Sequence, residues 1–314
     1  MTGPCIGVDV GGTSVRAAVV DADGTVIDQR QSDTPVERTA AEAEIAGVIT
    51  DLAAKHPVRA VGLAIAGFVS ADMSRVMFAP HLAWRNAPVA DLIAARVGLP
   101  VVMDHDVNCA AWAEHTLGAA ASARVSLTVA IGTGIGAGLV VDGTLYRGAH
   151  GVAPELGHLA VIPAGRACAC GKRGCLERYC SGTALAATAL ERMASAESAP
   201  LAAALEAGDG TLTGLDVARA ARAGDAVALG AFADLGRWLG LGVAMACDVL
   251  DPEIVVIGGG VSRSADLFLD AARERLEREL TGAHYRVVPP LVPARFGDAA
   301  SMVGAALIAA RRVG

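Results

Sequence analysis

Aromatic residues and lysines are scarce in this chain of 314 residues. Phe, Trp and Tyr together make up 4% of it, and the only lysines are Lys55 and Lys172. The pattern Gly-x4-Gly-Lys-Ser/Thr is absent as a consequence, which excludes a P-loop as the phosphate site. Any phosphate site must therefore be built from backbone amides and arginines.

Long apolar runs are also missing. The nearest candidate for a membrane span, Leu127 to Val141, is short and rich in glycine, and Asp248 interrupts the apolar run that starts at Leu239. No charged region followed by an apolar region opens the chain, because Ile6 to Val10 already has the pattern of a strand. We therefore expect a cytoplasmic protein without a membrane partner.

Basic residues are outnumbered by acidic ones, which gives a net charge of -7. A nucleic-acid-binding domain usually presents a basic patch, so we expect no nucleic-acid partner. The hydrophobic share of 53% is sufficient for a large buried core. At this length two domains are more natural than one.

Four potential metal ligands lie within eighteen positions of one another: His158, Cys168, Cys170 and Cys175. Three thiolates and one imidazole are a ligand set of structural zinc, which is tetrahedral and has no open position. Gly171 and Gly174 supply the positive φ that so tight a loop needs. The odd number of cysteines, seven, disfavours a disulfide framework, although a redox or disulfide role is the alternative. Cys180 is surplus to a tetrahedral site.

Strands alternate with helices along the chain, which predicts the α/β class, with ligands beyond the carboxyl ends of the strands. The expected strands are residues 6–12, 14–20, 25–28, 59–65, 100–103, 253–257 and 287–293. The expected helices are residues 39–55, 88–97, 107–117, 235–250, 299–312 and one that Ser262 or Ser264 caps and that runs through Leu280.

A glycine-rich bend occurs twice, because Ser126 to Tyr146 echoes Cys5 to Ile27. Successive N–H groups of such a bend suit a phosphate oxygen, although an ordinary β-hairpin is the alternative. The repeat predicts two similar domains that face each other across a cleft. Asp9 in the first copy is Ala130 in the second, as expected if one ion lies beside one phosphate chain.

A third glycine turn, Gly258 to Gly260, separates an expected strand from an expected helix and allows a ribose to approach the backbone. Two glycine bends, this turn and the isolated Asp9 together describe phosphoryl transfer. Such a site needs amides for the phosphates, a carboxylate near Mg²⁺ and a base within reach of the attacking hydroxyl.

With these motifs the chain resembles the ROK family (repressors, open reading frames, kinases) of the sugar kinase/Hsp70/actin superfamily. The motifs are DVGGT at 9–13, IGTGIGAG at 131–138, ELGH at 155–158 followed by CACGKRGCLE, and VIGGGV at 256–261. The resemblance implies two ribonuclease H-like α/β domains that flank a central cleft, with a structural zinc knuckle. The domains expected are residues 1–107 plus 298–314, the closing helix returning to the first domain, and residues 108–297.

The resemblance also implies a role for individual residues. Asp106 matches the catalytic base; it could instead cap the helix at Val107, or do both. Sugar contacts are implied for Gly67, His105, Asp106, Glu155, His158 and Glu177. Contacts to ATP or its Mg²⁺ are implied for Asp9, Gly11, Gly12, Thr13, Thr133, Gly134, Gly258, Gly259 and Gly260. The zinc ligands implied are His158, Cys168, Cys170 and Cys175, with one histidine nitrogen on Zn²⁺ and the other toward the sugar.

Three positions depart from the family pattern. His105 stands where the family usually has the Asn that binds sugar hydroxyls, His81 stands where it often has Asn, and Ala66 where it often has Pro. One imidazole nitrogen cannot both donate and accept as an amide group can, so hydroxyl recognition is altered. Both His105 and His81 could also be ordinary surface or core residues, and for His81 this interpretation is favoured. These departures leave the sugar open.

The expected activity is ATP-dependent phosphorylation of the 6-hydroxyl of a hexose. Glucose is the first candidate, and this substrate would place the protein in glycolysis. An N-acetylhexosamine, N-acetylmannosamine or N-acetylglucosamine, is the alternative substrate, and polyphosphate an alternative donor. A sugar-sensing regulator is a rival from another class, but Asp9 follows the first residue too closely for a preceding helix-turn-helix. A homodimer or homotetramer is expected, since oligomers are common in the family.

Overall fold

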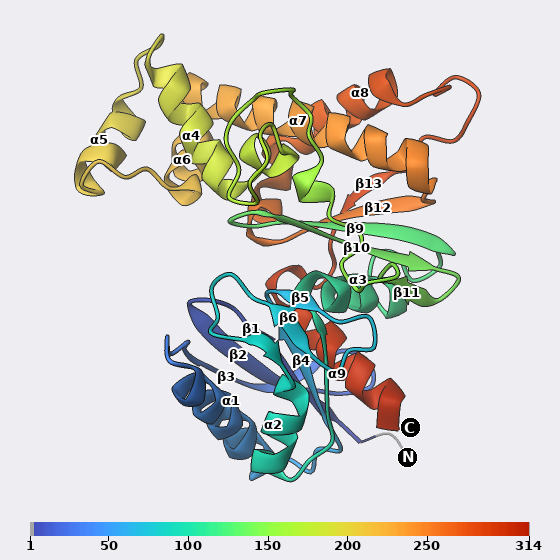
Figure 1. The fold of residues 1–314 in the computed structure, drawn as a ribbon. Helices are drawn as coiled ribbons and strands as arrows, with labels where there is room; N and C mark the ends of the chain where they lie inside the picture. The colour runs from blue at the N-terminus through green and yellow to red at the C-terminus, as the bar shows by residue number, and fades with distance from the viewer. Residues whose placement is uncertain (1–2, 314) are drawn as a thin grey trace. The chain divides into compact units, whose positions relative to one another are not determined.

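The structure is a computed structural model that describes residues 3–313. These residues form two compact units. Unit 1 holds the residues up to Thr128, Gly138–Pro154 and the residues from Ala294 on, and unit 2 holds Val129–Ala137 and Glu155–Pro293. Each unit is therefore assembled from segments that are distant in sequence (Figure 1).

Helices and strands alternate along the chain as the α/β class requires. The strands are β1 Cys5–Val10, β2 Ser14–Val20, β3 Val26–Asp33, β4 Val61–Ile65, β5 Phe68–Val69, β6 Val76–Phe78, β7 Arg85–Ala87, β8 Val101–His105, β9 Val125–Ile131, β10 Ile135–Val141, β11 Thr144–Tyr146, β12 Ile254–Gly258 and β13 Leu291–Pro293. The α-helices are α1 Arg38–Ala53, α2 Val89–Val97, α3 Asp106–Thr116, α4 Gly182–Met193, α5 Ala199–Ala207, α6 Gly214–Arg222, α7 Ala226–Leu250, α8 Leu269–Glu279 and α9 Ala300–Val313. Short 3-10 helices are η1 Leu156–His158, η2 Leu176–Arg178, η3 Gly260–Leu267 and η4 Gly297–Ala299.

The sheet of unit 1 has the strand order β3-β2-β1-β4-β8. β1, β4 and β8 are parallel, whereas β2 and β3 are antiparallel to their neighbours. Alternate residues of β1 point to opposite faces, so Ile6 and Val8 pack with the core of α1 and α2, while Cys5 packs with α9. Figure 1 shows α1 and α2 on one side of this sheet and α9 on the other.

Glycines allow α9 to pack directly on the strand backbones. A Cβ atom built on Gly7 would lie 1.8 Å from the carbonyl oxygen of Met302. One built on Gly62 would lie 1.9 Å from that of Ala305. Any side chain at these two strand positions would push α9 away from the sheet.

The second sheet repeats the order of the first. Its strands run β11-β10-β9-β12-β13, so β9 takes the place of β1, β10 of β2, β11 of β3, and β12 and β13 of β4 and β8. β10 and β11 are antiparallel and β12 and β13 parallel, as their counterparts are. The repeat in the sequence thus corresponds to a repeat in topology.

Three details differ from the sequence prediction. A small sheet of β5, β6 and β7 follows β4 where no strands were expected. The last strand is confined to β13, and residues 287–290 lie outside it. The helix expected from Ser262 or Ser264 is divided at Phe268 into η3 and α8, and the Ser262 hydroxyl donates to the Gly259 carbonyl oxygen instead of capping a helix.

The boundaries of the units also differ from those expected after residue 107 and before 298. α3 belongs to unit 1 because it packs on α9: a Cβ atom on Gly304 would lie 1.7 Å from the Cys109 carbonyl oxygen. The segment that returns to unit 1 at Ala294 is held by Glu114 of α3, a buried residue. Its carboxylate accepts hydrogen bonds from the amides of Arg295, at 3.1 Å, and Phe296, at 2.9 Å.

We expect Glu114→Ala to lower the free energy of unfolding by about 3 kcal/mol, because buried amide groups then lack an acceptor. The donors are the two amides above and that of Ala119, at 2.9 Å. Urea unfolding of the variant measures the loss. Glu277→Ala, at an exposed position of α8, is the control and should change stability by less than about 0.5 kcal/mol. Equal effects of the two substitutions would contradict the anchoring role.

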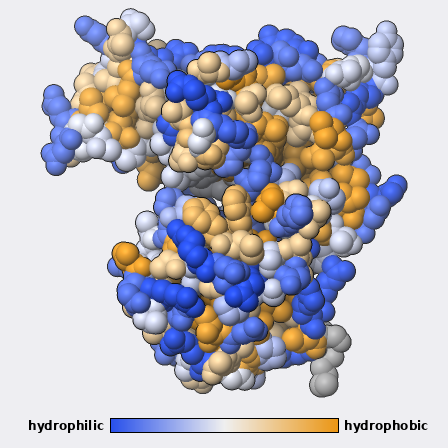
Figure 2. All heavy atoms as spheres, in the orientation of Figure 1, coloured by the Kyte–Doolittle hydropathy of each residue, from blue (hydrophilic) through white to orange (hydrophobic). Residues whose placement is uncertain are grey.

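One helix of residues 3–313, α7, is long and apolar enough to cross a membrane. Many of its apolar side chains are buried within unit 2, among them Phe232, Leu235 and Leu239, and Gly236 and Gly240 bring α8 close. A Cβ atom on Gly240 would lie 2.3 Å from the Ala272 carbonyl oxygen. Hydrophilic residues cover much of the face drawn in Figure 2. α7 is therefore the core helix of unit 2.

Candidate functional site

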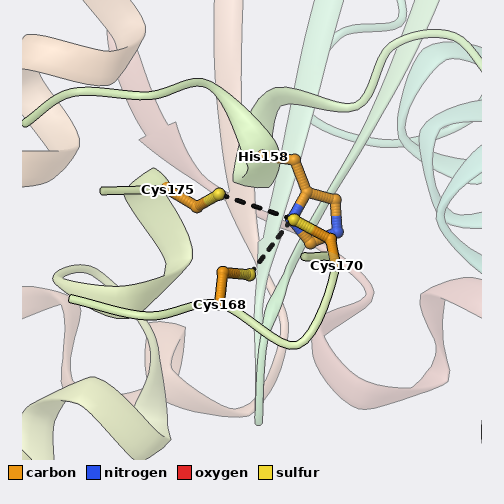
Figure 3. A group of neighbouring side chains, drawn as sticks. All are labelled: His158, Cys168, Cys170 and Cys175. Carbon is orange, nitrogen blue, oxygen red and sulfur yellow. Dashed lines mark hydrogen bonds between the residues drawn. The ribbon is translucent and has the colours of Figure 1, made fainter. Parts of the chain in front are cut away.

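The four predicted metal ligands converge in unit 2 (Figure 3). His158 ends η1, Cys175 precedes η2, and Cys168 and Cys170 lie in the loop between them. The loop folds back on itself because the Cys168 amide donates to the Lys172 carbonyl oxygen, at 2.9 Å. Gly171 and Gly174 have φ of 89° and 76°, the left-handed conformation that the sequence predicted for this loop.

Distances within this group fit a tetrahedral zinc ion. All four ligand atoms lie within 4.8 Å of one another. The sulfurs of Cys170 and Cys175 are 3.7 Å apart, and the Cys168 sulfur is 3.7 Å from Nδ1 of His158. Zinc–sulfur bonds of about 2.3 Å and a tetrahedral angle require sulfurs about 3.8 Å apart, and a nitrogen and a sulfur about 3.6 Å apart. The group therefore has the chemistry and the spacing to hold Zn²⁺.

The protonation of Cys168 also points to a cation. Burial, together with a contact of 3.0 Å to Oε1 of Glu177, raises the pKa of its thiol to about 12. A thiol so placed is a thiolate near neutral pH only when a bound cation compensates the charge. Zn²⁺ would supply that charge.

Two carboxylates flank His158 on different ring nitrogens. Nδ1 is 3.6 Å from Oε1 of Glu177, on the side of the cysteines, and Nε2 is 3.8 Å from Oε2 of Glu155. The side chains of Glu155, His158 and Glu177 are 32%, 26% and 19% exposed. A metal on Nδ1 would leave Nε2 beside Glu155 and fix the tautomer of the ring.

The second glycine bend lies next to the metal group. A Cβ atom on Gly134 would lie 2.8 Å from Oε2 of Glu177, so a side chain there would meet this carboxylate. The bend is closed by a hydrogen bond of 2.9 Å from the Gly132 amide to the Gly134 carbonyl oxygen. The Thr183 hydroxyl, near the start of α4, donates to the Thr133 carbonyl oxygen at 2.9 Å. The metal group, the second glycine bend and the start of α4 therefore lie in one region of unit 2.

The third glycine turn joins the same region. A Cβ atom on Gly259 would lie 2.5 Å from the carbonyl oxygen of Ile131, the residue that precedes the bend. Gly258 ends β12, and Gly260 begins η3 with open space where a Cβ atom would be. Unit 2 therefore brings together Thr133, Gly134, Gly258, Gly259, Gly260, Glu155, His158 and Glu177 with the metal ligands.

In unit 1 the predicted residues gather at the carboxyl ends of β1, β4 and β8. Parallel pairing places Asp9 beside Ala64 and Ala64 beside Asp104 in register. Gly67 follows β4, and Asp106 follows β8 directly. The carboxyl edge of a parallel sheet is where ligands of α/β folds bind.

The first glycine bend extends from this edge. The Gly11 amide donates to the Ser14 carbonyl oxygen, and the Thr34 hydroxyl donates to the Gly11 carbonyl oxygen at 2.7 Å. The Thr13 carbonyl oxygen accepts from the Thr34 amide at 3.1 Å. A Cβ atom on Gly12 would lie 2.4 Å from Cβ of His81, so the exposed His81 lies against the bend.

Asp106 begins α3 with its side chain 35% exposed. Its Oδ1 accepts a hydrogen bond of 2.7 Å from the Val107 amide and is 3.1 Å from Nε2 of His105. The hydrogen bonds of residues 3–313 leave Oδ2 available. Asp106 thus contributes to the start of α3 and still presents one oxygen, as a general base must.

Comparison with known proteins decides the family. The model of the ROK family matches residues 5–312. This chain belongs to the ROK family. It is 40% identical over 311 residues to a glucokinase of Streptomyces coelicolor, a match that covers 98% of each chain.

Solved structures agree with this assignment. A ROK family glucokinase from Streptomyces griseus, in complex with glucose and AMPPNP, superposes with a TM-score of 0.89 at 39% identity, covering 99% of this chain and 100% of that one. The chain is also 27% identical to a xylose repressor of Caldicellulosiruptor bescii, covering 87% of this chain and 69% of the repressor. The α/β fold of a ROK kinase, predicted from the motifs, is confirmed.

Two arginines of this ROK protein were missed in the sequence analysis. One forms an ion pair with Asp9, a predicted site residue, and the other with Asp104, which lies next to His105 in sequence. Arg16 forms an ion pair with Asp9, its partner in the β1–β2 register. Counting outward from the bend in both directions would have found this pair, since antiparallel partners are equidistant from a turn. Arg147 binds the buried Asp104 through Nε, at 3.0 Å, and Nη2. No local pattern predicts that contact.

Burial raises the pKa of the Asp9 carboxyl, the Arg16 guanidinium opposes the rise, and the charge of Asp106 adds to it. The ordinary pKa of an aspartate is 3.8. Between this pH and the raised pKa, the folded state therefore binds more protons at Asp9 than the unfolded state does. The stability that Asp9 contributes falls as the pH rises through its raised pKa. Asp9 is thus held in place at some expense of stability, as expected of a functional carboxylate.

We expect Asp9→Asn, which does not titrate, to gain stability relative to the wild type as the pH rises from about 4 to about 7. Each unit by which the pKa is raised corresponds to roughly 1.4 kcal/mol. Chemical unfolding at several pH values measures the difference. Asp23→Asn, at an exposed position of a turn, should show no such trend. A stability difference that shrinks with rising pH would contradict the sign.

Proposed function

We propose that this chain is an ATP-dependent glucokinase, which transfers the γ-phosphoryl group of ATP to the 6-hydroxyl of glucose. The observation that carries the proposal is the identity to glucokinases along nearly the whole chain. It is supported by an available carboxylate oxygen, Oδ2 of Asp106, at the carboxyl edge of a parallel sheet.

Asp106 acts as the general base in this proposal. Its Oδ2 takes the proton of the 6-hydroxyl as that oxygen attacks the γ-phosphorus, the bond from this phosphorus to the bridging oxygen breaks, and ADP leaves. Gly67, His105, Glu155, His158 and Glu177 orient the sugar. Charge-assisted hydrogen bonds from its hydroxyls to the two glutamates give recognition that depends on hydroxyl position.

The phosphates bind to the backbone amides of two bends, since the chain has no P-loop lysine. These are the bends at Gly11, Gly12 and Thr13 and at Thr133 and Gly134, while Gly258 to Gly260 line the adenosine. Asp9 fits the role of the carboxylate beside Mg²⁺, because Mg²⁺ is usually held by one or two carboxylates together with phosphates and water. Bound Mg²⁺ would neutralise charge that develops on the phosphates.

Zn²⁺ would be held by His158, Cys168, Cys170 and Cys175, with no open position for water. Its contribution is to hold the loop that carries Glu155, His158 and Glu177. All seven cysteines are free thiols in the structure, which suits a reducing cytoplasm. We also propose that the chain forms a homodimer or a homotetramer. Sedimentation velocity would measure which of the two is present.

Steady-state kcat/KM for glucose, N-acetylglucosamine and N-acetylmannosamine with ATP tests the substrate. Glucose is expected to be preferred strongly. A preference for an acetamido sugar would replace glucose by an N-acetylhexosamine, and activity with polyphosphate alone would replace ATP as donor. A gel shift with specific DNA at physiological salt, without kinase activity, would favour a regulator instead.

A further inference from the structure

A buried carboxylate lies near the end of β8, two residues before the proposed base. This residue, Asp104, is 1% exposed. Its Oδ1 accepts hydrogen bonds from the His105 amide, at 2.8 Å, and from Nδ2 of Asn108, at 2.9 Å. Its Oδ2 accepts from Nε of Arg147, at 3.0 Å, and from Nη2 of the same side chain. With four donors on its two oxygens, this carboxylate cannot rotate without losing hydrogen bonds.

Two of these donors bracket Asp106 in the sequence. His105 precedes the base directly, and Asn108 follows it by two positions in the first turn of α3. Because both bond to the same oxygen of Asp104, the backbone of Asp106 is fixed relative to the end of β8. Oδ1 of Asp106 also accepts from the Val107 amide at 2.7 Å, so Oδ2 is the oxygen that the side chain presents.

The other two donors belong to Arg147, which follows β11. Its Nη1 donates to the Leu145 carbonyl oxygen at 3.3 Å, and its own carbonyl oxygen accepts from the Ala153 amide at 3.1 Å. The Arg147 side chain is 19% exposed. The carboxylate of Asp104 is therefore attached to a segment of unit 1 that is itself held by hydrogen bonds.

This arrangement is an expensive way to stabilise a fold. A buried ion pair loses much of its attraction to desolvation, and an apolar pair of similar volume often gives equal or greater stability. Asn108 adds to the cost, because it is 2% exposed and its Oδ1 has no hydrogen-bond partner among the described residues. Buried polar groups of this kind can serve to specify one conformation, and here that conformation is the one around the base.

We propose that Asp104 is a positioning residue for the base Asp106, supported by Arg147 and Asn108. It holds the junction of β8 and α3 so that Oδ2 of Asp106 reaches the proton to be removed. A general base must lie within hydrogen-bond reach of that proton, and a misplacement of about 1 Å can cost about 100-fold in rate. The inference rests on the proposed function, and it gives a role to residues outside the sequence motifs.

The variants Arg147→Met and Asn108→Ala test the proposal with glucose and ATP. R147M leaves the buried carboxylate without its cation and should lower kcat about 10- to 100-fold, while KM for glucose changes less than about threefold. N108A removes one donor and retains the ion pair. It should lower kcat about threefold or more, and it tests the same role if R147M does not fold.

A neutral pair tests position against charge. In the double variant D104N/R147Q, Asn retains an Oδ1 acceptor for the His105 amide and for Asn108, and its amide group can donate to Gln. This variant should recover most of the kcat that R147M loses. A double variant that folds like the wild type but is as slow as R147M would show that the charge matters and not the position, which would overturn the proposal.

Arg124→Met is a matched control. Arg124 also binds an aspartate of unit 1 through two nitrogens, Nε at 3.0 Å and Nη2 at 2.8 Å from Oδ1 of Asp142. The two side chains of this pair are 75% and 62% exposed. R124M should leave kcat and KM unchanged, because this pair lies on the surface and has no part in the proposed site.

A double-mutant cycle separates positioning from general loosening of the fold. Because Asp104 acts through Asp106, R147M should not lower further the residual rate of Asp106→Asn, although it should lower the melting temperature in both backgrounds. Equal fold-losses of kcat in the two backgrounds would assign the effect to destabilisation and overturn the proposal. Unchanged kcat in both R147M and N108A would do the same. A wild-type protein that fails to phosphorylate glucose would instead refute the proposed function, a result distinct from an active wild type whose variants are unaffected.

Discussion

Replacement of Asp106 by asparagine is expected to lower kcat about 10²–10⁴-fold, the usual contribution of a general base. The amide group has no basic oxygen for the proton of the 6-hydroxyl, yet it is nearly isosteric and retains an oxygen for the Val107 amide, which now bonds Oδ1 at 2.7 Å. The start of α3 should therefore survive. Glucose binding should persist, because the remaining sugar contacts are unchanged.

Coupled assays of ADP release measure kcat, and isothermal titration calorimetry measures glucose binding. Asp91→Asn is a suitable control, since Asp91 is exposed on the first turn of α2 and has no part in the proposed site. It should retain full activity. If Asp106→Asn kept more than about a tenth of the wild-type rate, Asp106 would not be the base.

Loss of the zinc group is expected to weaken fold and sugar binding together. In Cys175→Ser a fully buried ligand is removed, one whose sulfur is 3.7 Å from that of Cys170. Structural zinc contributes about 10–16 kcal/mol of binding free energy in small zinc peptides, and several kcal/mol of stability should be lost here. KM for glucose should rise about tenfold or more, because the loop holds His158 and Glu177, while kcat at saturating glucose changes less.

Zinc content by mass spectrometry, thermal unfolding and KM are measured on the same preparations. Cys180→Ala is the matched control, because Cys180 is buried five residues further on but is not part of the metal group. It should keep one zinc per chain and the wild-type KM. A zinc-free Cys175→Ser protein with unchanged KM and melting temperature would show that the metal does not position the sugar site.

The metal group and the glycine bends could be predicted from sequence because their information is local. The spacing of Cys168, Cys170 and Cys175, with glycines between them, is sufficient to describe a metal loop, and the structure brings the sulfurs to zinc-like distances. The repeat of one bend in two halves of the chain likewise predicted two similar domains, and the structure contains two sheets of the same strand order. In both cases turn chemistry over a few residues determines the geometry.

Contacts between residues far apart in the sequence came only from the tertiary structure. Arg147 reaches Asp104 from 43 positions away. Glu114 binds amides about 180 positions away and so places the unit boundary at Ala294, which no composition shift marks.

The sequence by itself therefore determined the family and the α/β class, and it singled out the four residues of the metal group and the proposed base. It also marked His105 as a departure from the family pattern, at a position where that pattern implies a contact with sugar. Only the tertiary structure placed Nε2 of His105 on Asp106 and Arg16 on Asp9. The physical reason is that ligand type and turn chemistry depend on neighbours in sequence, whereas the direction of a side chain depends on everything that packs around it.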